Sequence, residues 1–139
     1  MNDAHLFSAA KEVSFKSDYS GGNHNHIGCV IAYKGTILAN GFNSNKTHPI
    51  QSKYNYLRFK NDGNNYLPEK VHSEIHALSK IKYLDIDFSR VHIYVYRELK
   101  NGNLALARPC PSCMAAIKAM GIRHVHFSTA DGFAHEVLK

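Results

Sequence analysis

The sequence predicts an α/β fold in which helices cover a sheet, within a single domain that spans residues 1–139. Two observations carry this prediction. Short apolar segments with the character of strands alternate with two internal segments of helical spacing, which is typical of a sheet covered by helices. The chain also has only 139 residues, of which 44% are hydrophobic, enough to bury one core but too few for two full-sized domains.

The first part of the chain is predicted to form a helix and a hairpin. Within residues 5–17, apolar side chains recur at the i, i+3, i+4, i+7 spacing of an amphipathic helix. Residues 27–33 and 37–42 are apolar, with β-branched residues, and Lys34-Gly35 separates them as a turn. Residues 43–68 are polar, and a connection this long inside a compact domain is usually functional or partly disordered.

Two further helices and a strand are predicted in the second part. Residues 71–84 return to helical spacing, and residues 91–96 alternate as a strand before a turn at 101–103. Residues 111–120 form a helix that Gly121 ends.

The last two strands are predicted to be antiparallel. Residues 125–128 form strand four, and residues 133–138 form a short fifth strand after the turn at Asp131-Gly132. Only residues 129–139 follow strand four, which is too few for the helical crossover that a parallel neighbour requires. Strand five should therefore run antiparallel to strand four.

The charge balance favours an anionic partner. The chain has 17 Lys and Arg against 11 Asp and Glu, a net charge of +6, which suits phosphates or nucleic acid. It has no apolar run of about 20 residues and no basic start followed by an apolar secretion segment, so we expect no membrane association and a cytoplasmic location. Three cysteines cannot all pair with one another, so metal binding or buried thiols are favoured over disulfides.

The residues best suited to chemistry lie at the starts of two predicted helices. One group is His72-Ser73-Glu74 and the other is Pro109-Cys110-Pro111-Ser112-Cys113. Two cysteines three residues apart in a first helical turn lie on one face, where the helix N-terminus favours thiolates, so they can share a metal ion. A neutral histidine as third ligand would leave zinc one open position, as in catalytic sites. Glu74 lies close enough to carry a proton without being a ligand.

Other interpretations of these residues stay open at this point. Cys110 and Cys113 could be half of a structural zinc site or a redox pair, although the second C-x-x-C that a structural site usually needs is absent. His76 lies one turn after His72, which makes a two-histidine metal site geometrically possible; the alternative is a hydrogen-bonded or packed neighbour. Cys29 lies among apolar strand residues and is predicted to be a small core residue.

The H-x-E and P-C-x-x-C motifs resemble those of the zinc-dependent cytidine and deoxycytidylate deaminase superfamily. The similarity extends over residues 27–128 in the order of the family's segments. Residues 28–31 and 41–43 look like its first two strands, and residues 121–125 look like the entry to its fourth. The resemblance implies a three-layer α/β/α fold with a five-stranded mixed sheet.

The resemblance also implies a ligand set and a reaction. Zinc would be bound by His72, Cys110 and Cys113, and zinc-hydroxide attack on the carbon bearing the exocyclic amine would convert cytosine to uracil. Glu74 would be the catalytic proton shuttle. Cytosine is favoured over adenine on family frequency alone. Asn43 would contact the sugar or base, and a homo-oligomer is possible because this superfamily often builds its pockets from neighbouring subunits.

The carrier of the base is harder to predict. Residues 53–60 interleave three cations with three aromatic rings, and Tyr54, Tyr56 and Arg58 could hold single-stranded nucleic acid by stacking and phosphate contacts. The alternative is that the tyrosines cover the core. With the positive net charge, this segment favours single-stranded DNA as the substrate. The antiparallel fifth strand instead resembles the free-cytidine and bacterial toxin-type enzymes. A deaminase of free cytidine, deoxycytidine or dCMP, and a non-catalytic nucleic-acid-binding zinc module, remain alternatives.

Overall fold

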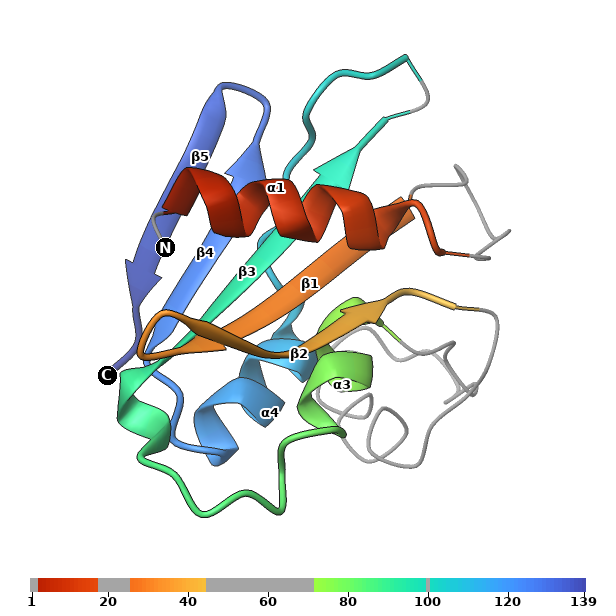
Figure 1. The fold of residues 1–139 in the computed structure, drawn as a ribbon. Helices are drawn as coiled ribbons and strands as arrows, with labels where there is room; N and C mark the ends of the chain where they lie inside the picture. The colour runs from red at the N-terminus through yellow and green to blue at the C-terminus, as the bar shows by residue number, and fades with distance from the viewer. Residues whose placement is uncertain (1–2, 18–25, 45–71, 100) are drawn as a thin grey trace, which may run out of the picture.

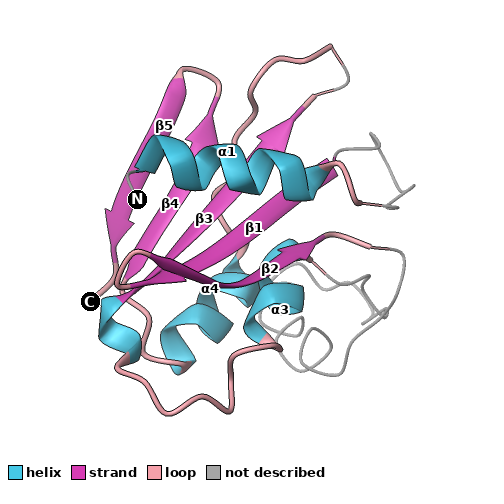
Figure 2. Cartoon of the chain, in the orientation of Figure 1, coloured by secondary structure: helices cyan, strands magenta, loops and turns pink. Residues whose placement is uncertain are grey.

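The structure is a computed structural model that describes residues 3–17, 26–44, 72–99 and 101–139. In this part of the chain, a five-stranded sheet lies between one helix on one face and two helices on the other (Figures 1 and 2). The three-layer α/β/α prediction is confirmed. The strands are β1 (His26–Tyr33), β2 (Thr36–Phe42), β3 (Val91–Glu98), β4 (His124–Thr129) and β5 (Gly132–Val137). The helices are α1 (Asp3–Ser14), α3 (Ser73–Leu78), α4 (Pro111–Ala119) and the short 3₁₀ helix η1 (Phe88–Arg90).

The sheet is mixed, and its strand order is β2-β1-β3-β4-β5. β1 is antiparallel to both β2 and β3, and β3 is parallel to β4. β5 pairs antiparallel with β4, so the prediction from the short C-terminal stretch is confirmed. The central strands bring residues that are far apart in sequence into fixed register.

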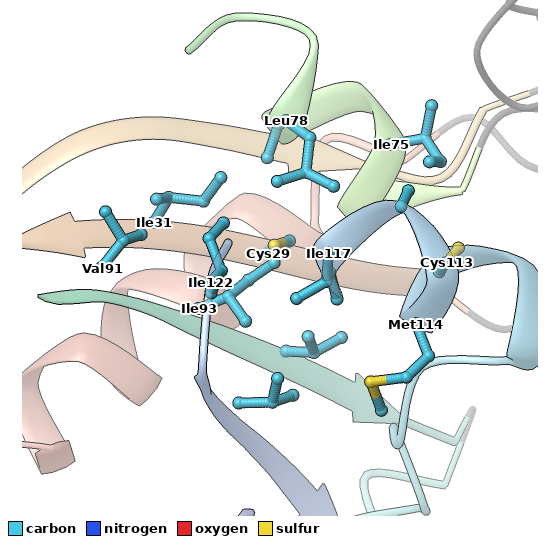
Figure 3. Close-up of a cluster of buried hydrophobic side chains, with 14 of the residues drawn as sticks. Cys29, Ile31, Ile75, Leu78, Val91, Ile93, Cys113, Met114, Ile117 and Ile122 are labelled. Carbon is cyan, nitrogen blue, oxygen red and sulfur yellow. The ribbon is translucent and has the colours of Figure 1, made fainter. Parts of the chain in front are cut away.

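Each face of the sheet buries its own apolar cluster, because alternate residues of a strand point to opposite faces. Ile93 and Val95 of β3 pack toward α3 and α4, whereas Tyr94 packs toward α1. The larger cluster lies on the α3 and α4 face (Figure 3). Among its fully buried members are Cys29, Ile31, Ile75, Leu78, Val91, Ile93, Cys113, Ile117 and Ile122. The start of α4 is thereby anchored in the main core.

The hairpin between β1 and β2 turns at the predicted residues. Lys34 has a φ of 51° and Gly35 a φ of 80°. Two successive positive φ values are the pattern of a type I′ turn, whose twist matches that of the strands it joins. The hairpin places the end of β2 beside α3 (Figure 1).

The helix predicted over residues 71–84 is shorter than expected, since α3 ends at Leu78. The chain continues in tighter i→i−3 turns, in which the N–H of Ile81 donates to the carbonyl of Leu78 at 3.1 Å. The hydroxyl of Ser79 also donates to the carbonyl of His76 at 2.7 Å, a local bond that competes with helix propagation. Ile81 is nevertheless buried, so the apolar spacing correctly marked a core contact but not the helix length.

The second predicted helix ends close to where Gly121 indicated. The last residue of α4 is Ala119, and Gly121 follows with a φ of 90°, a conformation that glycine adopts without strain. Across the described residues, no helix combines the length and apolar character needed to cross a membrane.

Candidate active site

The His-x-Glu and Cys-x-x-Cys motifs lie at the N-termini of two helices. His72 precedes α3 with an extended backbone, and its carbonyl accepts the first helical bond, from the N–H of His76, at 3.0 Å. Cys110 occupies the same position before α4, and its carbonyl accepts a bond from the N–H of Met114 at 2.8 Å. Pro111 fills the first position of α4, where a backbone N–H would have no partner within the helix. The backbone hydrogen bonds of the two helix starts therefore fix the positions of His72 and Cys110.

These two helix starts bring the three predicted metal ligands together. Nδ1 of His72 lies 3.2 Å from Sγ of Cys113 and 3.6 Å from Sγ of Cys110. One ligand atom from each of the three residues lies within 4.8 Å of the other two. Zinc bound at about 2.3 Å from sulfur and about 2.0 Å from nitrogen spaces tetrahedral ligands by about 3.5–3.8 Å. The donor set and its spacing therefore fit a zinc ion.

The two thiols are not equivalent. Cys113 is fully buried, whereas Cys110 and His72 are only partly buried, so the site is reached from the Cys110 side. The hydrogen bond with Cys113 lowers the pKa of the Cys110 thiol to about 3, and the same contact raises the pKa of Cys113. The hydroxyl of Ser112 lies 3.1 Å from Sγ of Cys110. This asymmetry favours the thiolate form at the less buried Cys110, and a divalent cation bound there would displace the remaining thiol proton.

Glu74 is a buried carboxyl group beside this donor set. Its exposed fraction is 5%, and burial raises its pKa. The hydroxyl of Ser73 donates to Oε1 of Glu74 at 2.6 Å. A buried carboxyl group whose pKa is shifted upward is suited to take up and release a proton near neutral pH.

Sequence reasoning missed the two serines of the motifs. Ser73 and Ser112 are both fully buried, and each contacts a functional group, Glu74 or Cys110. Both occupy variable positions of the motifs, so only their small polar character next to buried functional residues could have indicated this role.

His76 is not part of the metal-binding group. Its Nδ1 accepts a hydrogen bond from the backbone N–H of Phe42 at 3.2 Å, and its ring packs edge-on against the Phe42 ring with centroids 4.8 Å apart. This confirms the interpretation as a hydrogen-bonded neighbour. Cys29 is fully buried in the main cluster, as predicted for a small core residue.

Asn43 directly follows β2 and is buried. Its Oδ1 accepts hydrogen bonds from the hydroxyl of Ser17 at 2.6 Å and from the backbone N–H of Ile27 at 2.9 Å. These contacts hold the carboxamide in one orientation and join the segment after α1 to the start of β1. Tyr54, Tyr56 and Arg58, the other predicted substrate contacts, lie outside the described residues.

Comparison with solved structures shows which proteins share this fold. The cytidine deaminase of Burkholderia pseudomallei superimposes with a TM-score of 0.66 at 16% identity, covering 99% of this chain and 93% of that chain. The dCMP deaminase of cyanophage S-TIM5 in its apo form gives a TM-score of 0.60 at 19% identity, covering 91% and 84%. Its complex with dCMP and dUMP gives 0.59 at 19% identity, covering 91% and 82%. No curated protein matches the chain.

Comparison with family models shows the family itself. Residues 1–129 match the model described as the cytidine and deoxycytidylate deaminase zinc-binding region. The matched range includes both motifs that converge in the structure, and the description names a zinc-binding region, which fits the His72, Cys110 and Cys113 donor set. The chain therefore belongs to the cytidine and deoxycytidylate deaminase family of zinc-binding hydrolases.

Proposed function

We propose that the protein hydrolyses the exocyclic amine of a free cytosine nucleoside or nucleotide, releasing ammonia and the uracil product. The observation that carries this proposal is the buried carboxyl group of Glu74 beside three converging nitrogen and sulfur donors. A structural zinc site has no use for an adjacent buried acid, whereas hydrolytic deamination needs a group that moves protons.

His72, Cys110 and Cys113 would hold the zinc ion, and the thiolate form is favoured at Cys110. When bound, zinc would supply Lewis acidity that activates water at neutral pH. Burial of Cys113 and partial exposure of Cys110 leave the substrate side at the solvent-facing edge of the donor set.

Glu74 would move the proton. Oε1 accepts the hydrogen bond of the Ser73 hydroxyl, which helps to hold the carboxyl group in place. Glu74 would accept a proton from the attacking water and deliver it to the ring nitrogen. It would then accept the second proton, from the hydroxyl group of the resulting tetrahedral adduct, and deliver it to the amine, so that the carbon–nitrogen bond breaks, ammonia leaves and the product carbonyl forms. Burial raises the pKa of Glu74, which favours both roles. The carboxylate form is then a stronger base toward water, and the protonated form can still donate its proton to the ring nitrogen.

Two observations support a free nucleoside or nucleotide. β5 is antiparallel to β4, an arrangement that resembles the free-cytidine enzymes and the bacterial toxin-type deaminases. The solved structures that share the fold are named as cytidine and dCMP deaminases. We propose Asn43 as a substrate contact, because it follows β2, the strand packed against the helix that begins after His72.

Single-stranded DNA is the second candidate. It is supported by the net charge of +6 and by the alternating cations and rings of residues 53–60. On this hypothesis Tyr54, Tyr56 and Arg58 stack with bases and contact phosphates.

A substrate panel separates the two candidates. Zinc-loaded protein is incubated with cytidine, deoxycytidine, dCMP, and single-stranded DNA and RNA oligonucleotides that each contain one cytosine, and uracil formation is measured. We expect turnover of at least one mononucleoside or mononucleotide, lost by about 10²- to 10⁴-fold or more in Glu74→Gln with bound zinc unchanged. Turnover of DNA alone would overturn the free-substrate proposal in favour of the second candidate. No turnover of any substrate by zinc-loaded protein would support the non-catalytic module.

A further inference from the structure

Four histidines occupy neighbouring positions on the sheet face opposite the His72, Cys110 and Cys113 donor set. They are His92 on β3, His124 and His126 on β4, and His135 on β5, and we refer to them as the histidine cluster. The strand register places His92 beside His124 and His126 beside His135. The rings stack closely, with centroids 4.1 Å apart for His92 and His124 and 4.0 Å apart for His126 and His135.

The face on which the cluster lies follows from strand alternation. Tyr94, two residues after His92, belongs to the apolar cluster under α1, and Phe7 of α1 contacts the His126 ring edge-on. Val91 and Ile93 point to the opposite face, into the core around α3 and α4. In Figure 1, β3, β4 and β5 lie side by side, from the central strand to the β5 edge of the sheet, and the N-terminal end of α1 lies on the β5 side. The histidine cluster is therefore separated from the catalytic site by the sheet itself.

Three members of the cluster have the spacing of metal ligands. One ring nitrogen from each of His92, His124 and His135 lies within 4.8 Å of the other two. Nδ1 of His124 and Nε2 of His135 are 3.1 Å apart. Zinc bound to imidazoles at about 2.0–2.1 Å places tetrahedral ligand atoms about 3.4 Å apart. The distance between Nδ1 of His124 and Nε2 of His135 therefore suits a shared metal ion as well as a hydrogen bond between the two rings.

His126 and Asp3 provide the supporting contacts that metal-bound histidines usually have. Nδ1 of His92 lies 2.8 Å from Nε2 of His126. When His92 donates its Nδ1 proton in this bond, its Nε2 lone pair is available for a cation. Oδ2 of Asp3 lies 3.9 Å from Nδ1 of His126, while Oδ1 of Asp3 accepts a hydrogen bond from the Tyr94 hydroxyl at 2.6 Å. His126 is thus placed to accept the Nδ1 proton of His92 and hold its ring, as the hydrogen-bond partners of metal-bound histidines commonly do.

The cluster is also accessible and its strand backbone is in place, so that only side-chain rotation is needed to turn the stacked His92 and His124 rings, whose planes differ by 7°, toward one ion. His126 is buried, His92 and His124 are partly buried, and His135 is exposed, so an ion can enter from solvent on the β5 side. Burial lowers the pKa of both His92 and His124, which favours the neutral imidazole that binds metals. Because all four residues lie on paired strands, the backbone needs no reorganisation to present them.

We propose that His92, His124 and His135 form a second metal site, for a divalent transition-metal ion that prefers imidazole ligands, with zinc as the probe. An all-nitrogen donor set suits Zn²⁺, Cu²⁺ or Ni²⁺, in contrast to the thiolate-rich set of the catalytic site. The ion would join β3, β4 and the edge strand β5. This inference does not depend on the reaction proposed above.

Metal stoichiometry tests the proposal in the full chain. The protein is dialysed against buffer with zinc in the micromolar range, and zinc is measured by elemental analysis. We expect two zinc ions per wild-type chain and one in the His124→Asn/His135→Asn variant. The matched control is His26→Asn, which changes a strand histidine at the far end of the sheet and should keep two ions. Binding of a single ion by the wild-type chain, or of two ions by the double variant, would overturn the proposal.

Cobalt substitution shows which site is filled. Cobalt bound by Cys110 and Cys113 gives the intense charge-transfer absorption of metal–thiolate bonds, whereas an all-nitrogen site does not. The double variant should keep this thiolate absorption at full intensity, which shows that it is folded, and should lose the second equivalent of cobalt. Because His135 is exposed, the single variant His135→Asn offers a milder change and should weaken binding of the second ion at least tenfold. Unchanged affinity for the second ion in His135→Asn would contradict the assignment.

Discussion

Gly41 of β2 lies directly against the backbone of Ser73 at the start of α3. A Cβ built on Gly41 would lie 2.4 Å from the carbonyl oxygen of Ser73 and 2.5 Å from the backbone nitrogen of Ala77. Separations this short are excluded for real side chains, and the atoms in the way are backbone atoms that cannot rotate aside. The absence of a side chain at this one position lets the helix that carries Glu74 pack closely on the sheet.

Gly41→Ala should therefore disturb the active site as well as stability. We expect a loss of stability of about 1–3 kcal/mol or more, as for other overpacked sites, together with weaker zinc binding because Ser73 and its neighbours His72 and Glu74 must shift. Thermal unfolding in chelator and cobalt titration of the thiolate site measure the two effects.

The matched control is Gly28→Ala on the opposite face. A Cβ there would lie 2.1 Å from the carbonyl oxygen of Ala10 in α1. It should destabilise the fold by a similar mechanism while cobalt binding to the folded protein stays unchanged. Equal loss of metal affinity in both variants would show that Gly41 acts through global stability alone.

Removing the metal or one of its thiolate ligands should lower stability. A ligand that binds only the folded state, present at a concentration 100 times its dissociation constant, stabilises that state by about 2.7 kcal/mol, so chelation should lower the melting temperature.

Cys113→Ser should lose most of the cobalt–thiolate absorption, because it replaces a buried sulfur donor by a hard oxygen. Cys29→Ala, a change at the other fully buried cysteine, serves as control and should keep the absorption. Equal cobalt–thiolate absorption in the wild type, Cys113→Ser and Cys29→Ala would mean that Cys113 is not a metal ligand.

The pairing of Cys110 and Cys113 was predictable from sequence because the relevant geometry is local, whereas His72, 38 positions before Cys110, was assigned from the resemblance of its motif. Two cysteines three apart at the start of a helix share a face whatever the rest of the fold does, and Pro111 marks that start. The Lys34-Gly35 turn was predictable for the same reason, since its backbone conformation depends on two adjacent residues.

Contacts between distant segments were not predictable in this way. The hydroxyl of Ser17 reaches Asn43 across 26 positions of sequence. The histidine cluster depends on the register of three strands, because a shift of one residue would turn His126 or His135 to the other face. The end of α3 at Leu78 was missed because Ile81 keeps helical spacing although its backbone is in a turn.

Asn43 should act on substrate binding separately from its structural role. Asn43→Asp keeps an oxygen that accepts the bonds from Ser17 and Ile27 but replaces the amide donor by a charged oxygen. We therefore expect a KM at least tenfold higher with the fold intact, since a contact to sugar or base would be lost. Steady-state kinetics and thermal unfolding of the same preparations test this.

Ser17→Ala is the structural control for that change. It removes the hydroxyl that donates to Asn43 and should cost about 1 kcal/mol of stability, with a much smaller effect on KM. A parallel rise of KM in both variants would mean that Asn43 only supports the backbone around Ile27.

The pair of Arg108 and Glu136 should couple β5 to the segment that leads into α4. Nη2 of Arg108 lies 3.0 Å from Oε2 and 3.2 Å from Oε1 of Glu136, so the guanidinium contacts both carboxylate oxygens. Both side chains are more than a third exposed, which limits the stabilisation by this ion pair to about 0.2–1 kcal/mol; contact with both oxygens favours the upper end.

A double-mutant cycle with Arg108→Ala and Glu136→Ala should yield this coupling energy at low ionic strength. In about 1 M salt, where the screening length is about 3 Å, the coupling energy should be smaller. The Asp87 and Arg90 pair, more exposed and 3.5 Å apart, should show weaker coupling in the same cycle. Coupling that is absent, or that does not respond to salt, would mean that apolar packing and backbone pairing alone hold β5 against this segment.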